Sequence, residues 1–466
     1  MPNLATTSTR LPAAAPSVLR QPSAAAGGDR WDLLLLCVAG YILTAVGRVH
    51  QLFSILELLR PAILTGLLGI ALYLFDHRGC RQPRFLWMNT TKWLLALLCW
   101  MALSVPGALL PGYSFDLVVD NFIKTVLMYV VMVGAVRGIH DVERLAGVYL
   151  FSAASYATVV LTRFDLGSGT EWRLGHLYYY DANDFATFAV TAMPLGLYFT
   201  MAARRIGTRL FGFAALSVLT VAFVRSGSRG GFIALVTVAA FIVVRYTAVP
   251  LRWRLGSVAI VGLLVLGAAS DTYWRQMSTI LSDNDYNHTE ESGRVQIWRR
   301  GIGYMFTHPI VGVGPNNFGA AEGLLSPFAV RQQFGIGVRW NAPHNSFVQV
   351  GAELGIPGLV FFLALIASAL GALRGRDGDQ ESDDAESLPE LRQVLTASIV
   401  GFVVGAFFLS LAYAELLYTL IALAAGLYKV TAAPEPVRRM RHVTPLAQAY
   451  RRRQDALQPH DLHQRA

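Results

Sequence analysis

The chain has 466 residues, of which 54% are hydrophobic and only 15% are charged, and its formal net charge is +9. Soluble domains carry about a quarter charged residues, so this composition excludes a soluble globular protein and indicates an integral membrane protein. The excess of Lys and Arg is typical of cytoplasmic loops, and we expect no nucleic-acid partner. The three cysteines show no metal-ligand spacing, and we expect neither a metal nor a cofactor.

Residues 1–30 are rich in Ala, Pro, Ser and Gly. This composition predicts a disordered cytoplasmic tail. Apolar stretches follow, each close to the roughly 20 residues that a membrane helix needs. They lie at about 31–47, 60–76, 91–110, 117–136, 145–162, 184–202, 208–225, 229–246, 253–270, 355–373, 393–410 and 412–429. The sequence therefore predicts an all-α integral membrane protein of about 12 transmembrane helices, in regions 31–269 and 346–430.

The short basic loops predict the orientation. With twelve spans, "DHRGCRQPR", "VRGIHDVER", "AARRIGTR", "RYTAVPLRWR" and "LRGRDGDQ" all fall on one side. Loops of this kind stay in the cytoplasm, so we expect both termini there. The basic tail 431–466 is then expected to contact membrane lipids. Residues 270–345 form one large outer loop, longer than ordinary connections, with room for two or three short helices.

Arginines also occur on the predicted outer side, where positive charge opposes the usual bias. They are Arg48, Arg60, Arg163, Arg173, Arg225, Arg229, Arg275, Arg294, Arg299, Arg300, Arg331 and Arg339. Because these arginines do not determine the orientation of the spans, we expect that part of the set binds a negatively charged group.

Two arginine motifs are candidates for phosphate binding. In "RSGSRGGFIAL", Arg225 and Arg229 flank a small-residue turn at which a helix starts, and helix starts expose N–H groups suited to phosphate. The alternative is a tight hairpin with snorkelling arginines. In "GRVQIWRRG", Arg294 opens an expected amphipathic helix that starts after Ser292 and stops before Pro309.

That helix has apolar residues at Val295, Ile297, Trp298, Ile302 and Tyr304. It also carries Arg299 and Arg300, either of which could join Arg294 in a bidentate phosphate clamp. The alternative for both is a solvated helix face.

The stretch "APHNSFVQVGAELGIPG" interrupts the apolar pattern with His344, Asn345 and Glu353 before a Gly-Ile-Pro-Gly break. A neutral imidazole accepts a proton from a hydroxyl near neutral pH, and broken helices are tolerated where they line a cavity. We therefore expect His344 at the mouth of a cavity. The alternative is an interfacial histidine that forms hydrogen bonds only.

The stretch "EWRLGHLYYYDANDFATFAV" offers a sugar-binding rim through Arg173 and His176. Its three tyrosines also fit an interfacial belt, which is the structural alternative. Asp181 and Asn183 resemble an N-cap at the entry to a span, which is a structural role as well.

Arginines and one histidine at an outer mouth, with no carboxylate pair and no nucleotide-binding loop in the sequence, favour a lipid-linked diphosphate as leaving group. The motifs "SGSRGG", "GRVQIWRRGIGYMFTHPIVGVGPNNF" and "PHNSFVQVGAELGIPG", in this order between about Leu150 and Leu373, resemble the O-antigen ligase and polymerase superfamily. The resemblance implies a polytopic enzyme of the bacterial inner membrane. Such an enzyme transfers a glycan from undecaprenyl diphosphate to an acceptor hydroxyl at the periplasmic face, without a metal.

The resemblance also implies roles for individual residues. Arg229 and Arg294 would bind the diphosphate, and His344 would be the general base of an inverting transfer. We add Arg173, Arg225, Arg300, Asn345 and Glu353 as expected substrate-binding residues.

The acceptor stays open, because ligases use lipid A–core, polymerases use a second lipid-linked repeat and related enzymes use protein serines. We favour the ligase. A flippase or transporter for a lipid-linked glycan is the competing class, although one long outer loop and the lack of an obvious internal repeat argue against it. A structural scaffold would leave the outer arginines unexplained.

Overall fold

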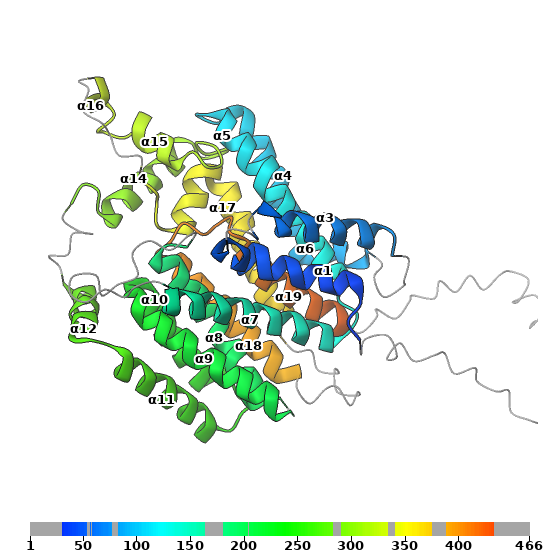
Figure 1. The fold of residues 1–466 in the computed structure, drawn as a ribbon. Helices are drawn as coiled ribbons and strands as arrows, with labels where there is room; N and C mark the ends of the chain where they lie inside the picture. The colour runs from blue at the N-terminus through cyan, green and yellow to red at the C-terminus, as the bar shows by residue number, and fades with distance from the viewer. Residues whose placement is uncertain are drawn as a thin grey trace, which may run out of the picture.

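The computed structural model describes residues 30–53, 56, 58–76, 83–163, 180–203, 205–282, 290–333, 341–374 and 388–432. Within these ranges the regular structure is all helical, as Figure 1 shows. Arg173, His176 and nearly all of both terminal tails lie outside the described residues, so the predictions made for them remain predictions.

Helices lie at all of the expected spans. Before the large loop they are α1 (Leu33–Tyr41) continued by η2 (Ile42–Val46), α3 (Pro61–Leu74), α4 (Asn89–Ser104), α5 (Pro111–Phe115) continued by η7 (Asp116–Phe122) and α6 (Ile123–Ala135), α7 (Ile139–Arg163), α8 (Ala182–Met201), α9 (Ile206–Ser226), α10 (Arg229–Arg245) and α11 (Leu251–Ala268). After it they are α17 (Ser346–Ala372), α18 (Leu388–Ala406) and α19 (Glu415–Thr431). The short segments η3 (Val49–Leu52), η5 (Pro83–Trp87) and η6 (Val105–Gly107) lie between spans.

Among the described residues, six helices are long and apolar enough to cross a membrane, namely the one that runs from Pro111 to Ala135, α7, α9, α11, α17 and α18. The predicted all-α architecture with apolar spanning helices is therefore confirmed. The count of about 12 spans stays a prediction, because the other helices are shorter or more polar; α10 and α19, for example, have 17 residues each.

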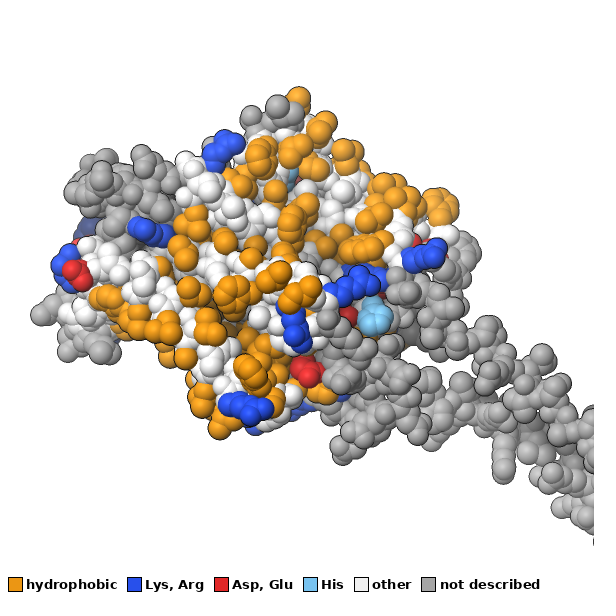
Figure 2. All heavy atoms as spheres, turned by 60° about the horizontal axis from the view of Figure 1, so that its bottom comes forward, with side chains coloured by type: hydrophobic (Ala, Val, Ile, Leu, Met, Phe, Trp, Pro, Cys, Tyr) orange, Lys and Arg blue, Asp and Glu red, His pale blue; other side chains and the backbone are white. Residues whose placement is uncertain are grey.

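The outer surface of the bundle is apolar over a wide area. Figure 2 shows hydrophobic side chains across one face, with Lys and Arg mainly toward its edges. In α11 the side chains of Leu251, Leu255, Leu263 and Leu266 are exposed. A soluble protein rarely exposes an apolar surface of this extent, and a hydrocarbon environment explains it.

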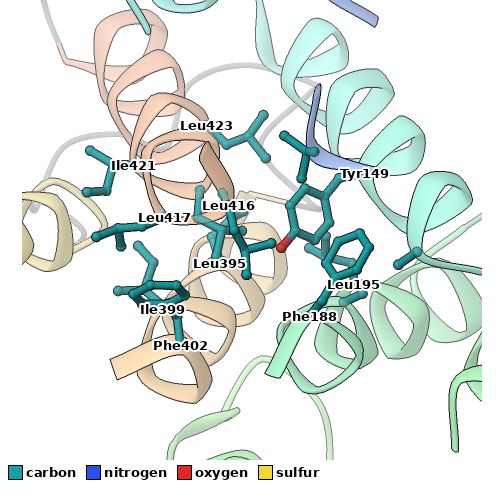
Figure 3. Close-up of a cluster of buried hydrophobic side chains, with 14 of the residues drawn as sticks. Tyr149, Phe188, Leu195, Leu395, Ile399, Phe402, Leu416, Leu417, Ile421 and Leu423 are labelled. Atoms are coloured by element: carbon teal, nitrogen blue, oxygen red, sulfur yellow. The ribbon is translucent and has the colours of Figure 1, made fainter. Parts of the chain in front are cut away.

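The core is built around α8, in which every side chain from Phe185 to Phe199 is buried. Side chains of α7 and α18 pack against it, and side chains of α19, which packs on α7 and α18, belong to the same cluster (Figure 3). Tyr149 of α7 stacks edge-on against Phe188, with ring centroids 5.6 Å apart, and its hydroxyl lies 2.8 Å from the Thr191 hydroxyl. A polar group buried this deeply is stabilised because it finds a hydrogen-bond partner.

The helix ends predicted to face the cytoplasm meet one another. Arg137, between α6 and α7, binds Asp141 at 2.7 Å and Asp32 at 3.5 Å. Lys429 near the end of α19 donates to carbonyl groups at the end of α6, including Val136 at 2.8 Å. Cations are stabilised at helix C-termini by the helix dipole. The contacts fit the alternating course of the predicted spans.

The large loop holds more short helices than the two or three expected: α12 (Asp271–Ser278), η8 (Thr279–Leu281), α14 (Arg294–Thr307), α15 (Phe318–Leu324) and α16 (Val330–Gln333). Helices α14 and α15 pack against α17, and Figure 1 shows α16 farther out, beyond them. The amphipathic α14 buries Ile297 and Tyr304, as predicted. Ile302 was placed on the same apolar face, and this is wrong, because its side chain is exposed.

Candidate functional site

The turn between α9 and α10 presents Arg229 at the start of a helix. The chain leaves α9 through Gly227 in the left-handed region (φ 57°), and the Ser228 hydroxyl then caps α10 by accepting from the Gly231 N–H at 3.1 Å. Arg229 is the first residue of α10, and its guanidinium donates to the Thr279 hydroxyl in η8 at 2.8 Å. The large loop therefore reaches over a helix start of the kind that binds phosphate. Arg225 lies four residues before Arg229, in the last turn of α9, and its side chain is half-buried.

The next residue, Gly230, packs against a segment far away in the sequence. A Cβ at Gly230 would lie 2.8 Å from the Phe408 Cβ, so the close approach depends on glycine. Phe408 belongs to residues 407–414, which connect α18 to α19 and are called the α18–α19 loop below. This loop forms one wall beside the start of α10.

The α18–α19 loop also forms a hydrogen bond with His344, the residue two positions before α17. The backbone N–H of His344 donates to the Ser410 hydroxyl at 2.9 Å, and the neighbouring Pro343 carbonyl accepts from the Trp298 indole at 2.9 Å. The Trp298 ring also packs edge-on against Phe407, at 5.3 Å between centroids. His344 itself is half-buried, with a left-handed backbone (φ 45°). Its position is fixed by the α18–α19 loop on one side and by α14 on the other.

Arg294 and Asp181 are charged groups that act on the His344 side chain. Arg294 opens α14, one turn before Trp298. Burial lowers the pKa of His344 below the ordinary value; the Arg294 charge lowers this pKa further, and the Asp181 charge raises it. The imidazole is thereby kept neutral at neutral pH, which is the form that accepts a proton.

Two residues near the site are helix N-caps, a role that was predicted for Asp181 but not for Asn345. Asp181 caps α8, and its carboxylate accepts from the N–H groups of Asn183 and Asp184 at 2.7 and 2.8 Å. Asn345, expected to bind substrate, caps α17 by accepting from the Phe347 N–H at 2.9 Å and is 2% exposed. Substrate binding by Asn345 stays a prediction.

Arg300 lies in a different group of residues. Its guanidinium forms a bidentate pair with Glu322 of α15, with N–O distances of 2.8 and 2.5 Å, and Tyr304 donates to the same carboxylate at 2.8 Å. The hydrogen bond to Glu322 raises the pKa of Arg300. The pair joins α14 to α15, and a phosphate would have to compete with Glu322 for the guanidinium.

Glu353 is buried at the predicted break in α17. Gly355, two residues on, has φ 69° and ψ −170° and kinks the helix; a Cβ there would collide with the Ile310 carbonyl oxygen. The Glu353 carboxylate accepts from the Tyr413 hydroxyl at 2.9 Å and from the Phe318 N–H at 3.2 Å. It ties α17 to α15 and to the α18–α19 loop. Substrate binding by Glu353 stays a prediction.

The Tyr413→Phe substitution is expected to lower the stability of the protein by about 1–3 kcal/mol, because it removes one hydrogen bond from the buried Glu353 carboxylate. The thermal unfolding midpoint of the purified protein in detergent measures this effect. Tyr113→Phe, at an exposed tyrosine of α5, is the matched control. An unchanged midpoint for Tyr413→Phe would show that the contact contributes little.

Carboxylates of the chain itself explain part of the outer arginine set. Arg48 pairs with Glu415 at the start of α19 at 3.4 Å, and Arg331 pairs with Glu291 at 3.1 Å. Together with Arg300, these arginines bind acidic side chains of the protein.

An apolar cavity of about 280 Å³ opens between α8, α9, α10, α11 and α12. Phe232, three residues beyond Arg229, lines it together with Trp274 and the α11 residues Val258, Val261 and Val265. Its lining is almost wholly apolar, so it suits a hydrocarbon chain rather than a sugar.

Comparison with known families gives a match for residues 213–363, to the family described as O-antigen ligase. This part of the chain is similar to the O-antigen ligase family. The matched domain spans less than half of the chain and runs from α9 into α17, so it includes Arg225, Arg229, Arg294 and His344. The match supports the resemblance to the O-antigen ligase and polymerase superfamily that the sequence motifs predicted. No curated protein matches the chain.

Several features around the candidate site could not be found from the sequence. Asp181 was interpreted only as an N-cap, and Thr279 and Ser410 carry no motif. All three act on the predicted residues from distant positions in the chain. Within the described residues, no group of three or more His, Cys, Asp and Glu side chains is placed to hold a metal ion.

Proposed function

We propose that this protein is a membrane glycosyltransferase that moves a glycan from undecaprenyl diphosphate to an acceptor hydroxyl, with lipid A–core as the favoured acceptor. The observation that carries the proposal is the link between His344 and the helix start at Arg229 through the α18–α19 loop, with Arg294 acting on His344 from the start of α14. Together they give a neutral base and two cations at helix starts.

The reaction follows from these groups. The His344 imidazole takes the proton of the acceptor hydroxyl, and the oxygen attacks the anomeric carbon from the face opposite the diphosphate. The bond between the anomeric carbon and the diphosphate oxygen breaks, and the electron pair stays on the diphosphate. Arg229 and Arg294 stabilise the charge that develops there, which is the form of catalysis that preorganised donors supply. The configuration at the anomeric carbon inverts.

The apolar cavity supports a lipid-linked donor. A diphosphate held at Arg229 would place the first part of its lipid tail beside Phe232 and Trp274, at the entrance to the cavity between α10 and α11. Because the tail would move from bilayer hydrocarbon into an apolar cavity, the cavity would position the donor without a large hydrophobic gain in binding energy.

The location is part of the proposal. We place the protein in the bacterial inner membrane, with both termini in the cytoplasm and the site facing the periplasm. The short basic loops between the predicted spans support this orientation. A pre-energised lipid-linked donor is the substrate that fits a compartment without nucleotide sugars.

Transfer should depend on pH in a way that reports His344. An ordinary histidine has a pKa of about 6.5; the pKa of His344 is lowered, so the acid limb of the rate profile should lie below that value. As pH falls through this pKa, the imidazole gains a proton and transfer is lost. Asp181→Asn should move the limb to lower pH, and Arg294→Gln should move it to higher pH. Initial rates from about pH 4.5 to about pH 8 measure these shifts, and a limb at the same pH in all three proteins would contradict the assignment.

In vitro transfer from a synthetic undecaprenyl diphosphate glycan tests the function. Lipid A–core, a second lipid-linked repeat and a serine-containing protein are offered in separate reactions, with and without a chelator. Product on lipid A–core, insensitive to chelator, is the expected result. Product on the second repeat or on protein would identify a polymerase or a protein glycosyltransferase instead. Tight donor binding and movement across a vesicle membrane, with no product on any acceptor, would favour a transporter.

A further inference from the structure

The α18–α19 loop, residues 407–414, lies outside the matched O-antigen ligase domain, which ends at residue 363. It nevertheless contacts both sides of the candidate site. Phe408 packs on the start of α10, and Tyr413 binds Glu353 in α17. The ion pair between Arg48 and Glu415 fixes the chain directly after the loop. The loop is thus attached along its whole length and forms a rigid support.

The α18–α19 loop forms three hydrogen bonds with His344 and Ser346, at and just before the start of α17. The Ser346 hydroxyl donates to the Leu409 carbonyl at 2.7 Å and accepts from the Leu411 N–H at 2.8 Å. Between these two contacts, the Ser410 hydroxyl accepts the backbone N–H of His344 at 2.9 Å. Ser346 is fully buried, and its hydroxyl bonds to the backbone of the α18–α19 loop. Ser410 is only half-buried, and its hydroxyl bonds to the backbone of His344.

The backbone of His344 needs this support. Its φ of 45° lies in the left-handed region, which residues with a Cβ adopt rarely. Such a conformation persists only where the surroundings determine it from several sides, and it is common at active sites. In this protein Ser410 holds the N–H of His344, Trp298 holds the carbonyl of Pro343, and Asn345 caps the following helix.

We propose that Ser410 is a positioning residue for His344: by accepting its backbone N–H, the hydroxyl fixes the left-handed turn that directs the imidazole to the acceptor. This proposal rests on the proposed function, because it gives His344 the role of the base. Ser410 would not touch the substrate. Its loss should therefore slow the chemical step and leave donor binding intact.

Kinetics of Ser410→Ala test the proposal in the full-length protein. Because a small misplacement of a catalytic group costs up to about a hundredfold in rate, we expect kcat to fall at least about tenfold while KM for the donor stays unchanged. Ser410→Thr keeps the hydroxyl and should restore most of the rate. Ser368→Ala is the matched control, since this serine of α17 bonds within its own helix, to Leu365 at 2.8 Å.

A second measurement reports the placement of His344 without relying on activity. The rate at which diethyl pyrocarbonate modifies His344, followed by peptide mass spectrometry across pH, gives its pKa in each variant. We expect this pKa to rise toward the ordinary histidine value in Ser410→Ala and to stay low in Ser410→Thr and Ser368→Ala. Because this readout needs no turnover, it remains valid even if no acceptor supports transfer.

The outcomes separate the two proposals. Wild-type transfer that needs His344 but is unaffected by Ser410→Ala would overturn the role of Ser410 and leave the proposed function standing. A loss in Ser410→Ala that Ser410→Thr does not restore, with donor KM raised and the unfolding midpoint lowered, would show a merely structural serine. The expected effect of Ser410→Ala on His344 modification, with no transfer to any acceptor, would overturn the proposed function alone.

Discussion

His344→Ala is expected to lower glycan transfer by about 10²- to 10⁴-fold, the usual contribution of a general base. The backbone contacts that fix this position do not involve the imidazole, since they use the His344 N–H and the Pro343 carbonyl. The variant should therefore insert and fold normally and bind the donor as before. The initial rate of transfer and the donor KM, measured side by side, check this expectation.

His308→Ala is the matched control, because His308, like His344, lies in the large loop of residues 270–345. It follows the end of α14, and its ring bonds to the neighbouring Thr307 hydroxyl. Its rate should equal that of the wild type. Transfer retained by His344→Ala would exclude His344 as the general base, although the two arginines could still bind the diphosphate.

Arg229→Ala is expected to lower kcat by about 10²- to 10³-fold, because it removes a donor aimed at the charge that develops on the leaving diphosphate. Arg229→Lys keeps the charge but loses the planar fork, and it should recover only part of the rate. The donor's dissociation constant should rise in both variants. Single-turnover rates at saturating donor separate the loss of binding from the loss of rate.

Arg331→Ala is a suitable control for charge alone, because this exposed arginine of the large loop pairs with Glu291 away from the turn. Its transfer rate should stay within about twofold of the wild type, as for most surface changes. An equal loss in Arg331→Ala and Arg229→Ala would indicate a general effect of net charge and would contradict a specific diphosphate site at α10.

The sequence predicted local features well because each had a local cause. The break between α9 and α10 follows from small residues and a Ser N-cap, and the kink in α17 occurs at Gly355, within the predicted Gly-Ile-Pro-Gly break. Amphipathic spacing predicted a helix begun by Ser292 and stopped before Pro309, and α14 runs from Arg294 to Thr307. Helix starts, stops and faces are determined by neighbouring residues, so a single sequence contains them.

Pairings between distant segments could not be predicted in this way. Nothing local to Arg300 shows that Glu322 occupies its guanidinium, and Arg48 meets Glu415 from the other end of the chain. The contact of Ser410 with His344 depends on how α18 and α19 pack beside α17. The number of spans is difficult to predict for the same reason. Helix α8 is buried by neighbouring helices, so its side chains can be less apolar than those of a helix that faces lipid.

The division of the outer arginines is the main gain from the structure. The sequence predicted only that a negatively charged group explains part of the set. The structure gives Arg48, Arg300 and Arg331 acidic partners within the chain, and it places Arg229 beside the neutral hydroxyl of Thr279 at the start of a helix. Glu322 holds Arg300, and the phosphate-binding proposal names Arg229 and Arg294 because each is the first residue of a helix.

The measurement that tests the central claim most directly is the stereochemistry of the transferred glycan. The purified protein is given a donor of known anomeric configuration and the acceptor that it uses, and the new linkage is determined by NMR, together with release of undecaprenyl diphosphate. Direct attack by a hydroxyl that His344 deprotonates predicts a single product of inverted configuration. A product of retained configuration would exclude a single direct displacement by that hydroxyl and would contradict the proposed role of His344 as the base for it.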